Sequence, residues 1–457
     1  AGTGKTTAMR VLVDAWRASG GTLLGLAPEA APAAILAEAT RARVETVDRL
    51  LHILDRHRPH HDTDGVRTAD DFPASVPMWI HQIDEQTLVI VDEHIKLSDR
   101  KRLQLFEFLT ARGATIRCVG DDKQLPAIDA GGAGIDTTHR PDTITLTHVV
   151  RFADTAEATA GLQLREADPA GFGFYLDNQR IHSGSAATIA DKAYGAWFAD
   201  QHAGREAIML APTHDIVTDL NRRARTDRLA RTPETPSAAT VLGDGLTASV
   251  GDIICTRRNN RHVRLGDTDW VRNGYRWRID TVHPDGSLTV THLRPGGKPG
   301  AATVLPPEYV GVHVRLGYAM TIDSAQGTTA DTCHTVLTGS ESRNQLYVAI
   351  TRGIHANHLY VPTTIDASEL SFWTEPAMLP QTAVEVLQHI LAREATHTSA
   401  HTALRDALDP HRRLGRAVDV YLDAIGVATE HALGADALTR LDHDAETLLP
   451  GLTDAPA

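Results

Sequence analysis

The stretch AGTGKTTAMR (Ala1–Arg10) opens the chain and carries the end of a phosphate-binding loop. The full pattern is G-x-x-x-x-G-K-[ST], and Gly4, Lys5 and Thr6 supply its last three positions. The first glycine of the pattern would lie upstream of Ala1. Loops of this kind precede a helix whose N-terminus points at a nucleotide phosphate. The stretch therefore predicts an α/β domain with such a helix over residues 6–19.

The residues of this loop have distinct expected tasks. Small residues let the backbone approach the β-phosphate, Lys5 reaches the β- and γ-phosphates, and the Thr6 hydroxyl holds Mg²⁺. Nucleotide kinases and GTPases share such a loop, so a second motif has to decide between these enzyme classes. The residues expected to bind the nucleotide are Gly2, Thr3, Gly4, Lys5, Thr6 and Thr7.

The stretch LVIVDEH (Leu88–His94) is that second motif. Apolar residues that run into Asp-Glu predict a buried parallel strand with two carboxylates at its C-terminal end. We expect Asp92 to bind Mg²⁺ through water, and Glu93 to polarise the attacking water as a general base. A GTPase would usually present Asp-x-x-Gly here and a kinase needs no Asp-Glu pair, so the motif favours a nucleotide hydrolase.

Polar side chains also follow two later predicted strands. TIRCVGDDKQLPAI (Thr115–Ile128) predicts a buried strand and a loop in which Gln124 can touch the γ-phosphate. LTHVVRF places Arg151 after a predicted strand over residues 143–146. An arginine at this place can reach across a cleft and stabilise transition-state charge, although a surface salt bridge is the alternative reading.

A second arginine stands at the end of NQLYVAITRG (Asn344–Gly353), which predicts an amphipathic helix. We expect Arg352 to supply a second guanidinium for the γ-phosphate. Two arginines from another half of the protein would make hydrolysis depend on the closure of two halves.

The composition is that of a soluble globular protein, with 42% hydrophobic residues among 457. No segment approaches the about 18 consecutive apolar residues of a membrane span. The three cysteines are far apart, which argues against a zinc ribbon and fits a reducing cytoplasm. The net charge of −13 alone points away from nucleic acid, but the run RRNNRHVR (Arg257–Arg264) is a local basic patch.

Six motifs resemble, in this order, those of superfamily 1 helicases: AGTGKTT, VIVDEH, GDDKQLPAI, VVRF, TIDSAQGTTAD and QLYVAITRG. More narrowly, they resemble the RecD-like branch, which moves 5′ to 3′. LQLREADPAGFGFY, MLAPTHDIVTDLNRRAR and WVRNGYRW, together with the tail of the chain, resemble the helicase part of TraI/TrwC-type (MobF) conjugative relaxases from actinobacteria. The match covers most of the chain.

The resemblance implies an ATP-dependent translocase and helicase on single-stranded DNA and duplex junctions, with ATP and Mg²⁺ as cofactors. Gln326 and Gly327 would couple the nucleotide state to DNA, and Thr46 and Thr321 would touch the DNA backbone. Relaxases of this type place a DNA-nicking domain before the helicase, so we expect such an upstream domain, with the conjugation machinery as a partner. This chain has no His-x-His triad and no paired tyrosines, so nicking is not assigned to it.

The expected architecture is an α/β fold with two RecA-like domains, residues 1–151 and 152–363. Residues 240–310 alternate apolar and polar residues with turn signals, which predicts an inserted small β-barrel where related helicases carry an SH3-like one. Residues 383–449 have helical spacing and predict a C-terminal helical appendage. The polar segment 53–77 is the place for a short pin insert.

Side chains of the insert are candidates to grip single-stranded DNA through stacking and charge. The alternative reading is that the aromatic residues form the core of the insert and that the basic run is a solvated loop. The residues expected to contact DNA here are Arg257, Arg258, Trp270 and Arg272.

Two positions depart from the helicase pattern. Position 323 is Asp where the family commonly has His, and position 94 is His where a small residue usually follows Asp-Glu. Two other functions therefore stay open: a RecD-like repair or exonuclease-complex helicase, and a DNA-binding remnant that does not hydrolyse ATP. The hydroxyls of Thr46 and Thr321 also have a structural alternative as caps at the ends of helices or strands.

Overall fold

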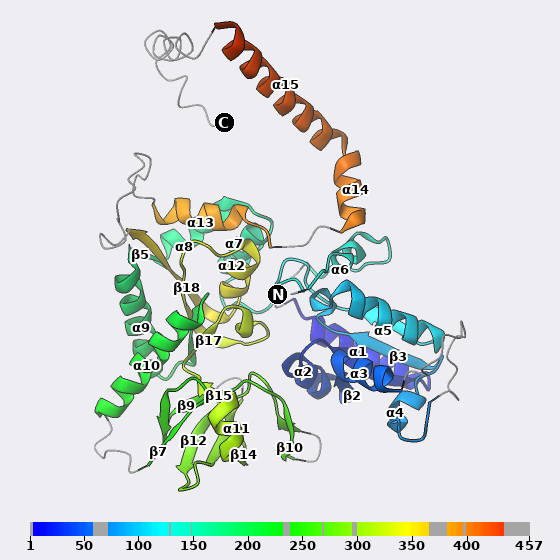
Figure 1. Cartoon of the computed structure of the whole chain (residues 1–457), viewed down its shortest axis with the longest axis vertical. Helices are drawn as coiled ribbons and strands as arrows, with labels where there is room; N and C mark the ends of the chain where they lie inside the picture. Colours follow the sequence, from blue (N-terminus) through cyan, green and yellow to red (C-terminus); the bar gives the residue numbers. More distant parts are fainter. Residues whose placement is uncertain are drawn as a thin grey trace. The chain divides into compact units, whose positions relative to one another are not determined.

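The computed structural model describes residues 3–57, 72–127, 129–147, 149–231, 238–266, 269–294, 299–364, 382–395 and 399–433. The chain divides into two compact units, Ala1–His397 and Thr398–Ala457. The first unit carries two parallel sheets and an antiparallel insert (Figure 1). Most of the predicted pin segment lies outside the described residues.

The first sheet has four parallel strands in the order β2-β1-β3-β4. Each strand is followed by a loop or helix that returns the chain to the same edge, as in open α/β sheets. The central strand β3 is buried at all five positions, as the apolar run predicts. The strands are β1 (Thr22–Ala27), β2 (Arg43–Thr46), β3 (Thr87–Val91) and β4 (Thr115–Cys118).

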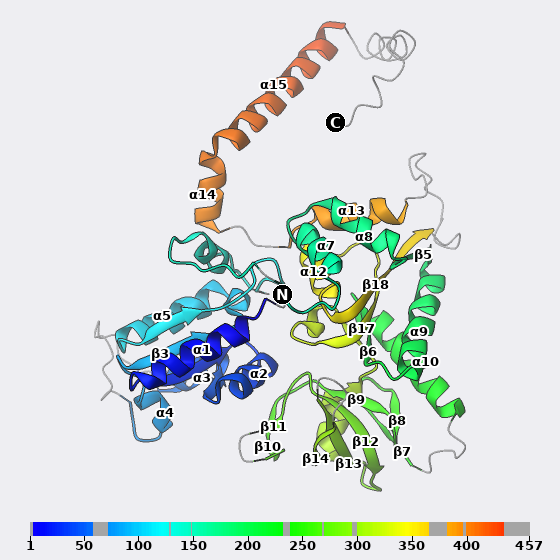
Figure 2. The ribbon, with the colours of Figure 1, turned by 180° about the vertical axis from the view of Figure 1, so that it is seen from behind.

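Helices cover both faces of this sheet (Figure 1 and Figure 2). On one face α1 (Lys5–Ala18) and α2 (Ala30–Thr40) pack on Leu88 and Ile90, and on the other α3 (Val47–Arg56) and α5 (Asp99–Ala111) pack on Val89 and Val91. Burial of each such aliphatic side chain contributes about 1.5–3 kcal/mol. The short helix α4 (Met78–His81) packs with α3 and α5 on this second face through Trp79 and Ile80.

The strand predicted over residues 143–146 is wrong. These residues form no strand, and Ile144 is 87% exposed. The segment follows the short helix α6 (Ala133–Asp136) and precedes Arg151 in the sequence. Threonine alternates with aliphatic residues in this segment, which is a pattern typical of a strand. The segment nevertheless pairs with no strand in the described part of the chain.

The second sheet has five parallel strands in the order β16-β6-β17-β18-β5. Its inner strand β6 is buried at every position. Strand β5 lies at the edge and has only partly buried or exposed residues, IHSGS. The strands are β5 (Ile181–Ser185), β6 (Ala207–Ala211), β16 (Ala319–Thr321), β17 (Ala330–Val336) and β18 (Gly353–Thr364).

Two groups of helices sandwich the second sheet. One group packs on Met209 and Tyr360, and the other packs on Ile208 and Leu359, which alternate along the same strands. The first group is α9 (Ala186–His202) and α10 (His214–Arg231); the second is α7 (Thr155–Arg165), α8 (Phe172–Asp177), α12 (Arg343–Ala349) and α13 (Ala383–Ala392).

The insert between β6 and β16 is an antiparallel sheet in the order β14-β13-β12-β9-β15, with two two-stranded ribbons beside it. The inserted small sheet is thus confirmed. Trp277 is fully buried in it and donates a hydrogen bond to Thr256 Oγ1, so this aromatic residue belongs to the core. The elements are β7 (Ala239–Val241), β8 (Thr247–Ser249), β9 (Ile253–Thr256), β10 (Asn260–Arg264), β11 (Trp270–Val271), β12 (Arg276–Val282), β13 (Leu288–Leu293), β14 (Pro299–Leu305), α11 (Pro307–His313) and β15 (Val314–Leu316).

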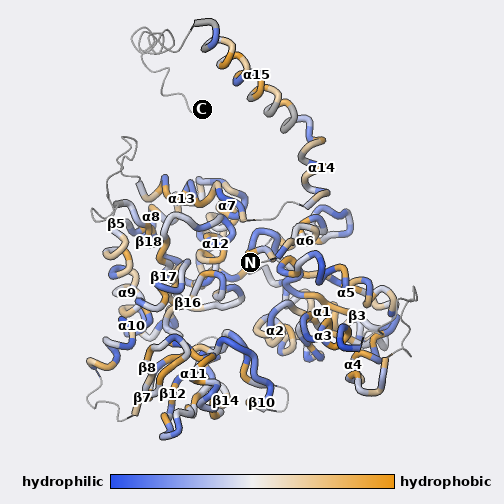
Figure 3. Tube along the Cα trace, in the orientation of Figure 1, coloured by the Kyte–Doolittle hydropathy of each residue, from blue (hydrophilic) through white to orange (hydrophobic). Residues whose placement is uncertain are grey.

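The β10–β11 ribbon connects the insert to the first domain. Arg261 pairs with Glu45 at 2.8 Å, and Arg272 Nη1 donates to Ala30 O at 3.1 Å. The ring of Trp270 lies between the guanidinium groups of Arg261 and Arg272, at 4.0 and 3.9 Å from its centroid. Figure 3 shows the β10 part of this ribbon as one of the more hydrophilic segments of the insert.

Replacement of Glu45 by glutamine is expected to destabilise the first unit by about 1–3 kcal/mol. Glu45 is 5% exposed and also accepts from Arg49 at 2.5 Å and from Arg43 at 3.4 Å, so the change leaves three guanidinium groups without their carboxylate. Burial raises the pKa of Glu45, but hydrogen bonds and charge from Arg49 and Arg261 outweigh burial and lower it. The stabilisation is therefore present above the ordinary carboxyl pKa and is lost as the pH falls through the lowered one.

Urea unfolding at pH 7 and pH 4 measures this effect. The exposed Glu107→Gln on α5 is the control, because it removes one negative charge from the same domain. Equal unfolding free energies for Glu45→Gln and the parent at pH 7 would contradict the structural role of the pair.

The second unit contains α14 (Ala400–Leu408) and α15 (Pro410–Leu433). Helix α15 carries apolar residues at Leu414, Val418, Tyr421 and Ile425, all of them exposed. No helix in the described ranges combines the length and the apolar character that a bilayer crossing requires.

Candidate functional site

The phosphate loop leads directly into α1. Gly4 has φ 78° and ψ 19° and precedes the first turn, and a Cβ built on it would meet nothing within 4 Å. Thr3 and Thr6 are half-buried and Thr7 is exposed, whereas Gly2 lies outside the described residues. The open N-terminus of α1 is thus available to a phosphate.

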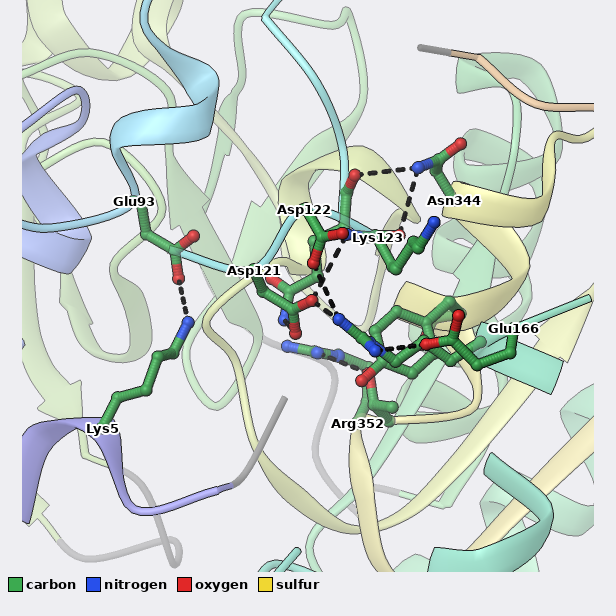
Figure 4. A network of polar contacts seen from close by, with 12 residues as sticks. Lys5, Glu93, Asp121, Asp122, Lys123, Glu166, Asn344 and Arg352 are labelled. Carbon is green, nitrogen blue, oxygen red and sulfur yellow. Dashed lines mark hydrogen bonds and ion pairs between the residues drawn. The ribbon is translucent and has the colours of Figure 1, made fainter. Parts of the chain in front are cut away.

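The Lys5 ammonium is the least satisfied group at this site. Its Nζ is buried and makes no hydrogen bond within the described part of the chain. It lies 3.8 Å from Glu93 Oε1, at the long end of ion-pair distances (Figure 4). A buried cation with unused donors costs free energy, so the geometry calls for an anionic ligand there.

The two carboxylates follow β3, as predicted. The Asp92 amide donates to Leu26 O on β1 at 2.9 Å, which fixes the strand end. Glu93 has a left-handed backbone with φ 50°. Residues other than glycine rarely adopt this conformation, and it often marks a functional site. Burial, together with the charge of Glu93, raises the pKa of Asp92 to about 6.

His94 has a structural role that its position in the motif did not reveal. The side chain is 4% exposed, and its Nδ1 lies 2.9 Å from Arg102 Nη1. Burial, together with the charges of Arg102 and Lys5, lowers the pKa of His94 to about 3. A neutral imidazole therefore accepts a hydrogen bond from Arg102, whose other nitrogen Nη2 donates to the His94 carbonyl oxygen at 2.7 Å.

Residues of the second domain reach these carboxylates. Gln326 Nε2 donates to Glu93 Oε2 at 3.3 Å, across 233 positions of sequence. Gly327 follows with φ 86°, a backbone conformation that favours glycine. The predicted pair Gln326 and Gly327 is thus brought to the expected general base.

Arg151 lies at the same place. Its Nη1 donates to Thr351 O at 2.6 Å, beside Arg352. Burial lowers the pKa of Arg151, while the charges of Tyr347, Glu93 and Asp121 oppose this shift. The guanidinium thus lies within the field of the Glu93 and Asp121 carboxylates.

Arg352 is placed differently from the expectation that it points at the nucleotide. It is 1% exposed and donates to the carbonyl oxygens of Val348, Ala325 and Thr328 at 2.8–3.3 Å. Its Nη2 also donates to Thr351 Oγ1 at 2.7 Å. The guanidinium therefore joins the end of α12 to the Gln326 loop inside the second domain.

The loop after β4 touches both domains. Gln124 is 5% exposed, and its side chain donates to Asp121 at 3.1 Å. Arg165 on α7 pairs with Asp122 at 2.7 Å and with Asp121 at 3.6 Å. In this state Gln124 is thus held within the loop by Asp121.

Asp323, the departure from the expected histidine, accepts a hydrogen bond from Gln345 Nε2 at 3.0 Å. The predicted DNA-contacting threonines cap local turns: Thr46 Oγ1 accepts from the Arg49 amide, and Thr321 Oγ1 accepts from the Ser324 amide, both at 3.3 Å. These contacts match the structural alternative for both hydroxyls and leave them at the C-terminal edges of β2 and β16.

Of the four insert residues predicted to contact DNA, two are buried in the ribbon and two line a cavity or a groove. Trp270 and Arg272 are at most 9% exposed and are used in the ribbon described above. Arg257 instead lines a small cavity of about 30 Å³ with Thr321, His214 and Arg315. Sequence reasoning missed His214 and Arg315, which come together only when α10 and β15 are packed.

Arg258 lines a larger and open groove of about 560 Å³ on the insert. The groove is rich in groups that can donate hydrogen bonds to an anionic backbone. Its lining comprises Arg258, Asn259, Asn260, Arg261, His262, Glu308, Tyr309 and His313.

The chain is similar to known proteins in its sequence and in its fold. Residues 1–186 match the family described as AAA domain. An uncharacterized protein of Mycobacterium tuberculosis is 40% identical over 96 residues, which are 20% of this chain and 52% of that protein. A probable conjugal transfer protein TraA of Sinorhizobium fredii is 26% identical over 360 residues, which are 77% of this chain and 29% of that protein. The chain thus spans about half or less of these curated relatives.

The fold is similar to the crystal structure of the Pif1 helicase from Candida albicans. The TM-score is 0.50 at 16% sequence identity, and the match covers 79% of this chain and 88% of that chain. At this identity the likeness concerns the fold of the two parallel-sheet domains and the inserted small sheet.

Proposed function

We propose, on the premise that the chain has a AAA domain and the fold of the Pif1- and RecD-like superfamily 1 helicases, that it couples ATP hydrolysis to movement along single-stranded DNA. The observation that carries this proposal is the contact of Lys5, Glu93 and Gln326. Two of these residues come from the first domain and one from the second, so a ligand that binds Lys5 also changes what holds the domains together.

The residues at the start of α1 suit ATP with Mg²⁺. The buried ammonium of Lys5 lacks a hydrogen-bond acceptor, and the backbone at Gly4 leaves open space above the helix N-terminus. Thr6 and Asp92 would hold Mg²⁺, which neutralises phosphate charge when bound. Glu93 would then orient and deprotonate the attacking water, and Arg151 would stabilise negative charge on the γ-phosphate.

The segment between Thr321 and Gln326 connects the surroundings of Glu93 to the proposed DNA-binding cavity. Gln326 lies five residues after Thr321, which lines the cavity with His214, Arg257 and Arg315. These donors suit a phosphodiester group and carry no base preference. Release of Gln326 from Glu93 would shift this loop and alter the grip on one phosphate.

Single-stranded DNA is the proposed partner, with a helicase action at duplex junctions in the 5′ to 3′ direction. The likeness to TraA supports a helicase part of a conjugative relaxase, which acts in the cytoplasm beside an upstream nicking domain and the conjugation machinery. A repair helicase would share the same nucleotide site, so the biological setting rests on this likeness.

ATP hydrolysis with and without single-stranded DNA tests the proposal. The chain is extended upstream through the first glycine of the phosphate loop, and hydrolysis is measured at 50 and 200 mM salt. We expect DNA to raise kcat more than tenfold at low salt, and less at high salt because phosphate contacts weaken as counterions compete. A folded chain that binds DNA but hydrolyses no ATP would contradict the proposal and favour a DNA-binding remnant.

A further inference from the structure

Asn344, the second residue of α12, forms hydrogen bonds through both the nitrogen and the oxygen of its side-chain amide. It is 1% exposed. Its Nδ2 donates to Lys123 O at 3.1 Å and to Gln124 O at 3.0 Å, and its Oδ1 accepts from the Ala395 amide at 3.1 Å. The side chain thus joins three segments from residues 123–124, 344 and 395.

The first of these segments belongs to the nucleotide site. Lys123 and Gln124 stand in the turn after Asp121, which accepts from the Lys123 amide and the Gln124 side chain. Figure 4 shows Asn344 reaching this turn from the second domain. Two carbonyl oxygens of one turn accept from the two hydrogens of one amide, which fixes the position of the turn relative to α12.

The second segment is α12 itself. Seven residues after Asn344 the chain reaches Thr351, whose carbonyl oxygen holds Arg151 at 2.6 Å. The helix is short, and its residues 346–349 are buried, so a movement at its N-terminus is transmitted to Thr351 rather than absorbed by bending. Asn344 therefore sets the distance between the Gln124 turn and the Arg151 guanidinium.

The third segment, residues 393–395, follows α13 and is bonded closely to the start of α12. The Arg343 amide donates to Arg393 O at 2.7 Å, and the Arg343 side chain pairs with Glu394 at 2.8 Å. Arg393 Nη1 in turn donates to Glu341 O at 2.7 Å. We call residues 393–395 the strap, since these bonds hold it across the N-terminus of α12.

We propose that Asn344 is a positioning residue for ATP hydrolysis, and that the strap holds its amide in the orientation that clamps the Gln124 turn. The inference rests on the proposed function, and it assigns a role to residues outside the six motifs. It predicts that loss of the clamp lowers kcat, while KM for ATP and the affinity for DNA stay nearly the same. Asn344 touches neither Lys5 nor the cavity that is proposed to bind DNA.

Two variants remove the clamp from opposite sides. Asn344→Asp keeps the shape but replaces two donors by a carboxylate oxygen that faces two carbonyl oxygens. Ala395→Pro removes the amide hydrogen that Asn344 Oδ1 accepts and leaves Asn344 itself in place. We expect kcat to fall about tenfold or more in each, with KM for ATP and DNA affinity within about twofold of the parent.

The controls share the location of these changes. Ala395→Gly retains the amide hydrogen, and Ser342→Ala removes the capping side chain of α12 without touching the Gln124 turn. Both are expected to retain the kcat of the parent. Thermal unfolding of all four variants separates a loss of activity from a loss of fold.

Hydrogen exchange of the chain without nucleotide gives a second readout. Asn344→Asp and Ala395→Pro should both raise exchange in the peptide that spans residues 121–127, whereas the controls should not. Unchanged kcat and unchanged exchange in folded variants would overturn the inference, as would equal changes in KM and kcat. A parent chain without ATPase activity would contradict the proposed function. The exchange measurement would still show whether the Asn344 amide holds the Gln124 turn in place.

Discussion

Lys5→Ala is expected to abolish ATP turnover, with kcat at least about a hundredfold below the parent and the fold retained. The ammonium makes no hydrogen bond within the described part of the chain and only a long ion pair, so its removal costs the apo protein little. In the nucleotide complex it would be the main cation at the phosphates, where buried charge has its largest effect. Hydrolysis by the upstream-extended chain, with saturating single-stranded DNA, measures the loss.

Glu93→Gln separates binding from chemistry at the same site. The amide keeps the size of the side chain but cannot accept the proton of the attacking water, so kcat should fall about 10²–10⁴-fold while nucleotide binding persists. Lys101→Ala is the matched control for Lys5→Ala, because Lys101 pairs with Asp48 on the surface of the same domain. DNA-stimulated hydrolysis retained in Lys5→Ala or Glu93→Gln would refute the assigned roles.

The central strands of the first domain and the position of the candidate carboxylates could be predicted from sequence because one physical signal fixes them. A strand buried on both faces needs a continuous apolar run, and Leu88–Val91 provides it before Asp92. The edge strand β5 lacks this signal, since IHSGS has one aliphatic residue and three small ones. The threonine-rich residues 143–146 carry a strand pattern, but pairing depends on neighbours that a local pattern does not contain.

The resemblance to superfamily 1 helicases is confirmed by the AAA domain and by the fold of the two domains. The sequence could not supply the partners of individual polar groups. Nothing local to His94 indicates that Arg102 stands beside it, and nothing local to Asp323 indicates Gln345. Such contacts depend on which helix face packs on a loop, so departures from a motif can be read only in the folded chain.

Arg352 and Arg151 are expected to fail in different ways. Arg352→Ala should destabilise the second domain by at least about 3 kcal/mol, because it orphans the carbonyl oxygens of Val348, Ala325 and Thr328 and leaves a cavity. Arg352→Lys should rescue little, since a single ammonium cannot reproduce the planar set of donors. Burial lowers the pKa of Arg352 to about 9, so the side chain is charged at neutral pH and the loss is not a matter of protonation.

Arg151→Ala should leave the unfolding temperature nearly unchanged, because the half-buried side chain makes one hydrogen bond to the residues that the structure describes, to Thr351 O. Its kcat should nevertheless fall about 10³-fold, as expected for an arginine that stabilises the charge of a transferring phosphoryl group. Thermal unfolding and hydrolysis on both variants decide between the two roles. If Arg352→Ala folds like the parent but loses turnover, its guanidinium leaves the carbonyl oxygens during the cycle and serves the nucleotide directly, as the motif alone had indicated. If Arg151→Ala retains turnover, Arg151 is not the group that stabilises charge on the γ-phosphate. The second domain then acts on the nucleotide through Gln326, and closure of the two domains controls hydrolysis through Glu93.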